Sequence, residues 1–172
     1  LDVTDSVKVA SAAALAASTY ANGTNGVGAT LTANANGALT IDGVAMSTND
    51  RVLIKDQTDA AQNGVYVVTN AGGASATFVL TRATDTDSAA EMTGGTFVFA
   101  EQGTANADNG FVFTHNGSPT MGTTDLTVSQ FSGAGQITAG AALTKTGNTL
   151  NVAVDDSSVE INSDALRVKA SG

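Results

Sequence analysis

Short runs of β-branched and aromatic residues, separated by turns that contain glycine or asparagine, recur from residue 29 onward. In the run at 78–82, phenylalanine, leucine and arginine alternate with valine and threonine, which is the period-2 pattern of a strand. The runs recur roughly every 10 to 20 residues, and this spacing favours an all-β fold, an antiparallel β-sandwich or barrel-like domain, over alternating strands and helices. Strands are predicted at 38–41, 51–55, 65–69, 78–82, 96–101, 111–114 and 126–131.

Residue pairs that favour turns separate these runs. Asp42-Gly43 is a preferred pair for the type I′ turn of a two-residue hairpin. Further turns are predicted at Asn63-Gly64, Gly94-Gly95, Asn109-Gly110 and Asn116-Gly117. The apolar residues of the runs are expected to form the core: Val52, Ile54, Val65, Val67, Leu80, Phe97, Phe99, Phe111, Phe113 and Phe131.

Two structures are possible for the alanine-rich segment Val9–Ser18. Alanine favours a helix of a few turns. Alanine alone sets no amphipathic stripe, however, so an extended or irregular entry segment fits equally well.

The sequence changes character at Ser132–Gly135, after which no aromatic residue occurs. Two strand–turn–strand units are predicted there: 143–150, turning over Gly147-Asn148, and Val159–Ile161 with Leu166–Val168. A lone hairpin with so little apolar surface is marginal in water. The segment is therefore either disordered or completes its core with other chains, and threefold association would also remove free strand edges. We predict a globular β domain at 1–132 and a β-hairpin shaft for trimerisation at 133–172.

Composition narrows the functional classes. Charged residues make up 13% of the chain, against roughly 25% in typical soluble domains. A surface of hydroxyls and amides suits an extracellular or virion protein better than a cytosolic enzyme. The formal charge of −9 with no basic run argues against binding of nucleic acid.

The chain lacks the residues that several kinds of functional site require. The chain has no cysteine and a single histidine, His115, which excludes disulfides, thiolate metal sites and multi-histidine sites. No apolar run approaches the roughly 18 residues that cross a bilayer, so membrane insertion is not expected. Because the chain begins with Leu1, we expect a fragment or processed product of a longer protein.

Several acidic and basic residues are candidates either for a chemical site or for a structural role. Asp85 and Asp87, with Glu91 nearby, offer carboxylates for calcium, but the EF-hand spacing is absent and capping of turns explains them as well. The same alternatives apply to Asp155-Asp156. Asp50-Arg51 and Lys55-Asp56 flank a predicted strand, either as a ligand site or as ion pairs at the strand ends.

Enzymatic signatures are weak. No GxSxG motif accompanies His115, so a turn histidine is the favoured interpretation. The only glutamates, Glu91, Glu101 and Glu160, have no spacing that predicts a glycosidase pair. The polar loops Gly23–Gly28 and Asn34–Gly37 are candidates for glycan contact, although polar loops are common on β domains. We predict no catalytic, metal or cofactor-binding residues and no cofactor.

The segment IDGVAMSTNDRVLIKDQTDAAQNGVYVV, residues 41–68, resembles a domain of phage tail fibre and tail-appendage proteins. The similarity continues through 81–99, 101–113 and 126–152, in the same order. The resemblance implies a homotrimeric fibre component that binds other tail or baseplate proteins in a virion and assists host attachment. No catalytic residues belong to these blocks. Two alternatives stay open: a carbohydrate-binding module that recognises a host surface glycan, and a bacterial surface filament protein unrelated to phages.

Overall fold

The structure is a computed structural model that describes residues 2–131, 139–146, 149–152, 154, 159–162 and 165–168. The chain divides into two compact units, Leu1–Phe131 and Ser132–Gly172, called here the head and the ribbon unit. Ser132–Gly135, where the sequence changes character, and the predicted turn residues Gly147-Asn148 lie outside the described residues.

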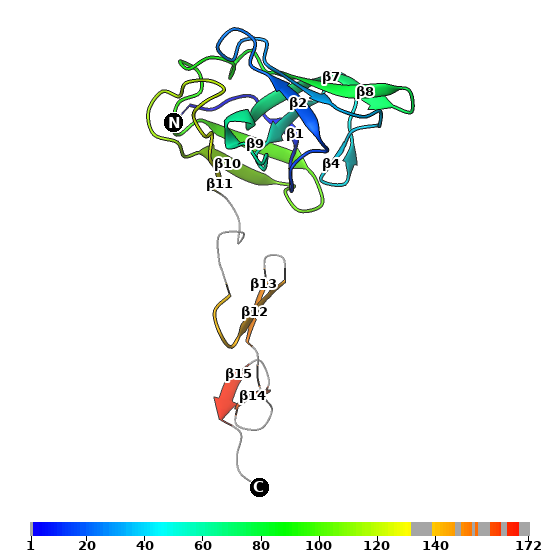
Figure 1. Ribbon diagram of the computed structural model, residues 1–172. Helices are drawn as coiled ribbons and strands as arrows, with labels where there is room; N and C mark the ends of the chain where they lie inside the picture. Colours follow the sequence, from blue (N-terminus) through cyan, green and yellow to red (C-terminus); the bar gives the residue numbers. More distant parts are fainter. Residues whose placement is uncertain are drawn as a thin grey trace. The chain divides into compact units, whose positions relative to one another are not determined.

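One nine-stranded sheet organises the head, in the order β11-β10-β9-β1-β6-β7-β8-β3-β2. Its longest strands, β7 and β8, form a hairpin that extends to one side of the head (Figure 1). The strands of the sheet are β1 (Val7–Ala10), β2 (Ser18–Ala21), β3 (Thr30–Ala33), β6 (Arg51–Ile54), β7 (Gly64–Gly73), β8 (Ala76–Arg82), β9 (Phe97–Gln102), β10 (Asn109–Phe113) and β11 (Val128–Gln130). A small hairpin, β4 (Thr40–Ile41) with β5 (Val44–Ala45), and one 3-10 turn, η1 (Ala60–Gln62), complete the head.

The all-β prediction is confirmed, but the pairing is mixed instead of wholly antiparallel. Strand β1 runs parallel to both of its neighbours, with Val9 opposite Val52 of β6 and Val7 opposite Ala100 of β9. The remaining neighbours in the sheet are antiparallel. Of the two structures considered for Val9–Ser18, the helix is wrong, because this segment completes β1, bends irregularly and enters β2.

Two apolar clusters form the core of the head. Alternation along β6 divides them, since Leu53 joins one cluster while Val52 and Ile54 join the other. Strand β7 divides in the same way, with Val65 in the first cluster and Tyr66 in the second. Each large apolar side chain buried in this manner stabilises the fold by about 1.5–3 kcal/mol.

The core prediction is partly wrong at the phenylalanines. Phe111 and Phe113 are buried, but Phe99 is 38% and Phe131 71% exposed, and Phe97 is half-buried. In β9 the core-facing positions belong to Val98 and Ala100, so the alternation of this strand is opposite to the predicted one. Val67 is only partly buried, while Val52, Ile54, Val65 and Leu80 are buried as predicted.

The turn predictions have mixed outcomes. Asp42 and Gly43 have φ values of 47° and 80° and close the hairpin between Ile41 and Val44, which confirms this turn. The turn at Asn109-Gly110 is wrong, because both residues belong to β10. The left-handed residue there is Asp108, at φ 57°.

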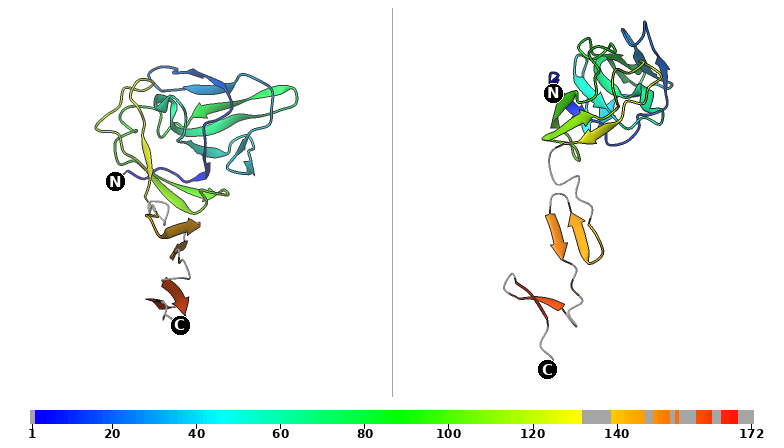
Figure 2. Two further views of the ribbon diagram at one scale, coloured as in Figure 1. Left: turned by 60° about the horizontal axis from the view of Figure 1, so that its bottom comes forward. Right: turned by 90° about the vertical axis from the view of Figure 1, so that its left-hand side faces the viewer.

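The ribbon unit contains two antiparallel hairpins. Strand β12 (Leu143–Thr146) pairs with β13 (Thr149–Val152), and β14 (Val159–Asn162) pairs with β15 (Ala165–Val168). Figure 2 shows the arrows of β12 and β13 side by side. Each pair forms a separate two-stranded sheet, as the sequence predicts.

Candidate functional site

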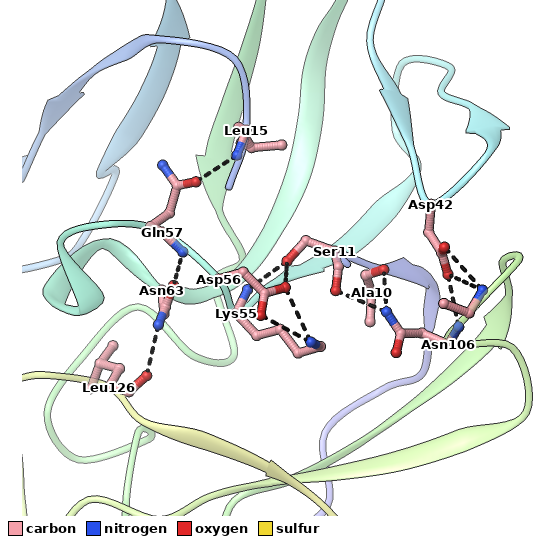
Figure 3. Close-up of polar contacts among 11 residues, drawn as sticks. Ala10, Ser11, Leu15, Asp42, Lys55, Asp56, Gln57, Asn63, Asn106 and Leu126 are labelled. Carbon is pink, nitrogen blue, oxygen red and sulfur yellow. Dashed lines mark hydrogen bonds and ion pairs between the residues drawn. The ribbon is translucent and has the colours of Figure 1, made fainter. Parts of the chain in front are cut away.

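A network of polar side chains fastens the irregular segments of the head to one another (Figure 3). It begins at the β4–β5 turn, where the Asp42 carboxylate accepts hydrogen bonds from the backbone N–H groups of Ala105 and Asn106, at 3.0 and 2.8 Å. The Asp42 carbonyl also accepts a bond from Thr104 N, at 3.0 Å. The Asp-Gly turn is thereby anchored to the loop between β9 and β10.

The network continues from this loop to the end of β6. Asn106 Nδ2 donates to the carbonyls of Ala10 and Ser11, at 3.3 and 2.9 Å. Ser11 Oγ donates to Asp56 Oδ2 at 2.8 Å and accepts from Lys55 N at 2.9 Å. Lys55 Nζ pairs with Asp56 at 3.1 Å and lies 5.5 Å from the centre of the Phe111 ring.

Two amides extend the same pattern. Gln57 Oε1 accepts from Leu15 N at 2.8 Å, and Asn63 Oδ1 accepts from Gln57 N at 3.0 Å. Asn63 Nδ2 donates to the Leu126 carbonyl at 3.1 Å. These side chains satisfy backbone groups that the sheet leaves without partners. Their geometry holds loops in place.

The buried guanidinium of Arg82 is the centre of a second group of hydrogen bonds. Its Nη1 donates to the Asn63 carbonyl at 3.0 Å, and its Nη2 donates to the hydroxyls of Tyr66 and Tyr20, at 3.1 and 3.4 Å. Burial raises the pKa of the Tyr66 hydroxyl above its usual value, although Arg82 opposes this. Tyr66 therefore keeps its proton, which it donates to the Gln62 carbonyl at 2.6 Å. Alternation in the run at 78–82 places Arg82 on the same side as Leu80, but its burial was not predicted, because arginine at a strand end is normally exposed.

The candidate calcium ligands have other partners. Asp85 pairs with Arg51 at 2.6 Å, and Glu91 accepts bonds from the N–H and hydroxyl of Ser88, at 3.2 and 2.8 Å. Among the described residues, no group of three or more acidic or histidine side chains is arranged to hold a metal ion. Glu91 thus caps a turn. Asp155-Asp156 lies outside the described residues.

Asp87 lies between Asp85 and Glu91, and we expect it to make the stability of the head depend on pH. Burial, and then the carboxylates of Glu91 and Asp85, raise its pKa, so the folded chain binds this proton more tightly than the unfolded chain. Protonation of Asp87 stabilises the folded chain in full at pH values below the pKa of this carboxyl in the unfolded chain, about 3.9. The stabilisation is lost as the pH rises through the higher pKa of the folded chain. We expect Asp87→Asn to raise the urea midpoint at neutral pH and to leave it unchanged near about pH 3.

Asp50 serves as a control, because its pKa is shifted in the opposite direction. Burial raises its pKa, but the Lys8 ammonium at 2.7 Å and the Ser47 N–H outweigh this, so the net shift is downward. Asp50→Asn should therefore lower the midpoint at neutral pH, with a smaller effect in acid. Equal pH profiles for the two variants and the parent would contradict both assignments.

The remaining candidates also have structural partners. His115 is buried, with Nε2 3.0 Å from the Met92 carbonyl and its ring at the edge of Phe113. At the ends of β6, Asp50 pairs with Lys8 and not with its neighbour Arg51, while Lys55 and Asp56 pair as the ion-pair alternative predicts. Glu101 accepts a bond from Ser6, and Glu160 pairs with Arg167 at 2.6 Å.

Hollows on the head surround the alanine-rich segment. One lies between 11–16 and 38–42, and another between Ala16–Ala17 and the loop at 33–38, with Phe78 lining both. The Asn34–Gly37 loop considered for glycan contact lines the second hollow. Phe78 is only 5% exposed, so it offers little ring surface on which a sugar could stack.

The first hairpin of the ribbon unit has two unlike faces. Leu143 is opposite Val152, and Lys145 is opposite Leu150, so these four residues share one face. Leu143, Leu150 and Val152 are 40%, 40% and 39% exposed. The other face carries only polar residues, Thr144, Thr146, Thr149 and Asn151.

The second hairpin repeats this division. Leu166 and Val168 lie two residues apart in β15 and therefore share one face. Leu166 and Val168 are 57% and 81% exposed. The polar face includes the Glu160–Arg167 ion pair. Among the described residues, each hairpin therefore exposes large apolar side chains on one face.

Comparisons with known proteins give no further guidance, since no family model, no curated protein and no solved structure matches the chain. Within the part of the chain that the structure describes, no helix is long and apolar enough to span a membrane.

Proposed function

We propose that this chain is a non-enzymatic structural module of a homotrimeric surface fibre, and more specifically of a phage tail fibre. The observation that carries the proposal is the set of large apolar side chains that the described strands of the ribbon unit expose on one face of each hairpin: Leu143, Leu150, Val152, Leu166 and Val168. A two-stranded hairpin cannot cover such a face itself. Two sister copies supply the missing cover with the same residues.

The network of the head supports a mechanical role. The residues that carry the phage-fibre resemblance, including Asp42, Gln57, Asn63 and Arg82, are engaged in holding loops and strands together. This rigidifies a domain that a fibre can present at a virion surface. A glycan-binding head is the second candidate function for which the Asn34–Gly37 hollow offers a place, and a glycan array tests it.

Light scattering with size exclusion tests the assembly. We expect a mass of three times 17.0 kDa for the full chain. Deletion of residues 136–172 should leave a folded head while weakening the trimer, because the head has its own core. A monomeric full chain at micromolar concentration would end the fibre proposal, and an unfolded truncated chain would show that the domain boundary is misplaced.

A further inference from the structure

Half of the phenylalanines of the chain lie on one outer face of the head. Phe97, Phe99 and Phe131 are three of the six, and none of them is fully buried. With Val3, which is 69% exposed, and Val112, which is half-buried, they form what we call the phenylalanine face.

The strand register makes this face continuous. Val3 and Val112 lie on either side of Phe97 in neighbouring chain segments. Phe99 is opposite Gly110, whose carbonyl accepts a hydrogen bond from Phe131 N at 2.7 Å. The rings of Phe97 and Phe131 meet edge to face, with centroids 5.8 Å apart. Four chain segments thus contribute to one apolar surface.

We propose that the phenylalanine face is the contact between the heads of sister copies, converging on the threefold axis. This inference rests on the proposed trimer. Phe131 is the last residue of the head, so the chain passes from this face directly into the ribbon unit. Association of the ribbons tethers three such faces at a high effective concentration.

The uncharged character of the phenylalanine face also favours a sister copy as its partner. At a net charge of −9, copies of the chain repel one another wherever their carboxylates approach. None of the five residues of the phenylalanine face is charged. The nearest carboxylate on the outer side of β9 is that of Glu101, which already accepts a hydrogen bond from Ser6. A contact between sister heads removes exposed aromatic surface from water.

Cysteine cross-linking of the full chain tests the contact. The chain has no cysteine, so a single introduced thiol reports only its own surroundings. Ser129 is exposed and pairs with Val112 of this face. With oxidised glutathione, we expect S129C to give a disulfide-linked dimer within the trimer at least about tenfold faster than the control A13C, placed in the exposed alanine-rich segment.

Substitutions within the phenylalanine face provide a second test of the head contact. F99S and F131S in the S129C background should slow cross-linking about tenfold without reducing the mass measured by light scattering, because the ribbons still hold the trimer. V27S, which changes an exposed valine in the Gly23–Gly28 loop, should have no effect. A trimer in which S129C cross-links no faster than A13C overturns the head contact alone. A monomeric parent chain overturns the proposed function as well.

Discussion

Leu150→Asp is expected to convert the proposed trimer into a monomer of 17.0 kDa, measured by light scattering. Leu150 shares one face of the β12–β13 hairpin with Leu143 and Val152, with Lys145 opposite it. The substitution replaces apolar surface by a carboxylate that loses its hydration when three copies meet on this face. Because Leu150 is 40% exposed in the single chain, loss of apolar burial alone costs about 0.6–1.2 kcal/mol per copy, which over three copies weakens association roughly twentyfold to a few hundredfold.

The neighbouring residue provides the matched control. Asn151→Asp adds the same charge one position away, on the polar face of the same hairpin. We expect this variant to remain a trimer. If both variants dissociate, total charge and not the apolar face controls assembly. If Leu150→Asp stays trimeric, the face is not the interface.

Gly64→Ala is expected to destabilise the head by about 2–5 kcal/mol, measured as the loss in free energy of unfolding in urea. Gly64 has φ 152°, which side chains disfavour, and an added Cβ would overlap Nη1 of Arg82. The guanidinium cannot move away freely, since its hydrogen bonds to Asn63 and Tyr66 fix it in a buried site.

The other end of the same strand offers the control. Gly73 closes β7, and a Cβ added there would meet no atom within 4 Å. We expect Gly73→Ala to change stability by less than about 1 kcal/mol. In an Arg82→Met background the overlap at Gly64 is relieved, so the cost of Gly64→Ala should fall to the backbone strain. An unchanged cost would show that Arg82 does not restrain this position.

The predictable parts of this fold are those set by local sequence. The turn at Asp42-Gly43 and the hairpins of the ribbon unit follow from residue type and alternation alone. The burial of Phe99 and Phe131 was predicted wrongly, because alternation shows that a strand has two faces without showing which one meets the core. In β9 the smaller Val98 and Ala100 fit the tightly packed side, and the rings are left outside.

The polar networks were beyond sequence analysis for a different reason. Asp42 and Asn106 meet only because the β4–β5 hairpin folds against a loop far along the chain. Likewise, nothing in the local sequence indicates that Arg82 lies between Tyr20 and Tyr66. Such contacts are set by the arrangement of strands, and the parallel placement of β1 had not been predicted.

The position of β1 also has a consequence for biosynthesis. Its two partners are β6 and β9, and the register joins Val7 to Ala100. As the polypeptide leaves the ribosome, residues 7–10 must wait without their second neighbour until residues 97–102 have been made. Contacts between such distant positions slow folding, and the waiting strand is open to wrong pairing. The head should therefore close late, after most of its sequence has been translated.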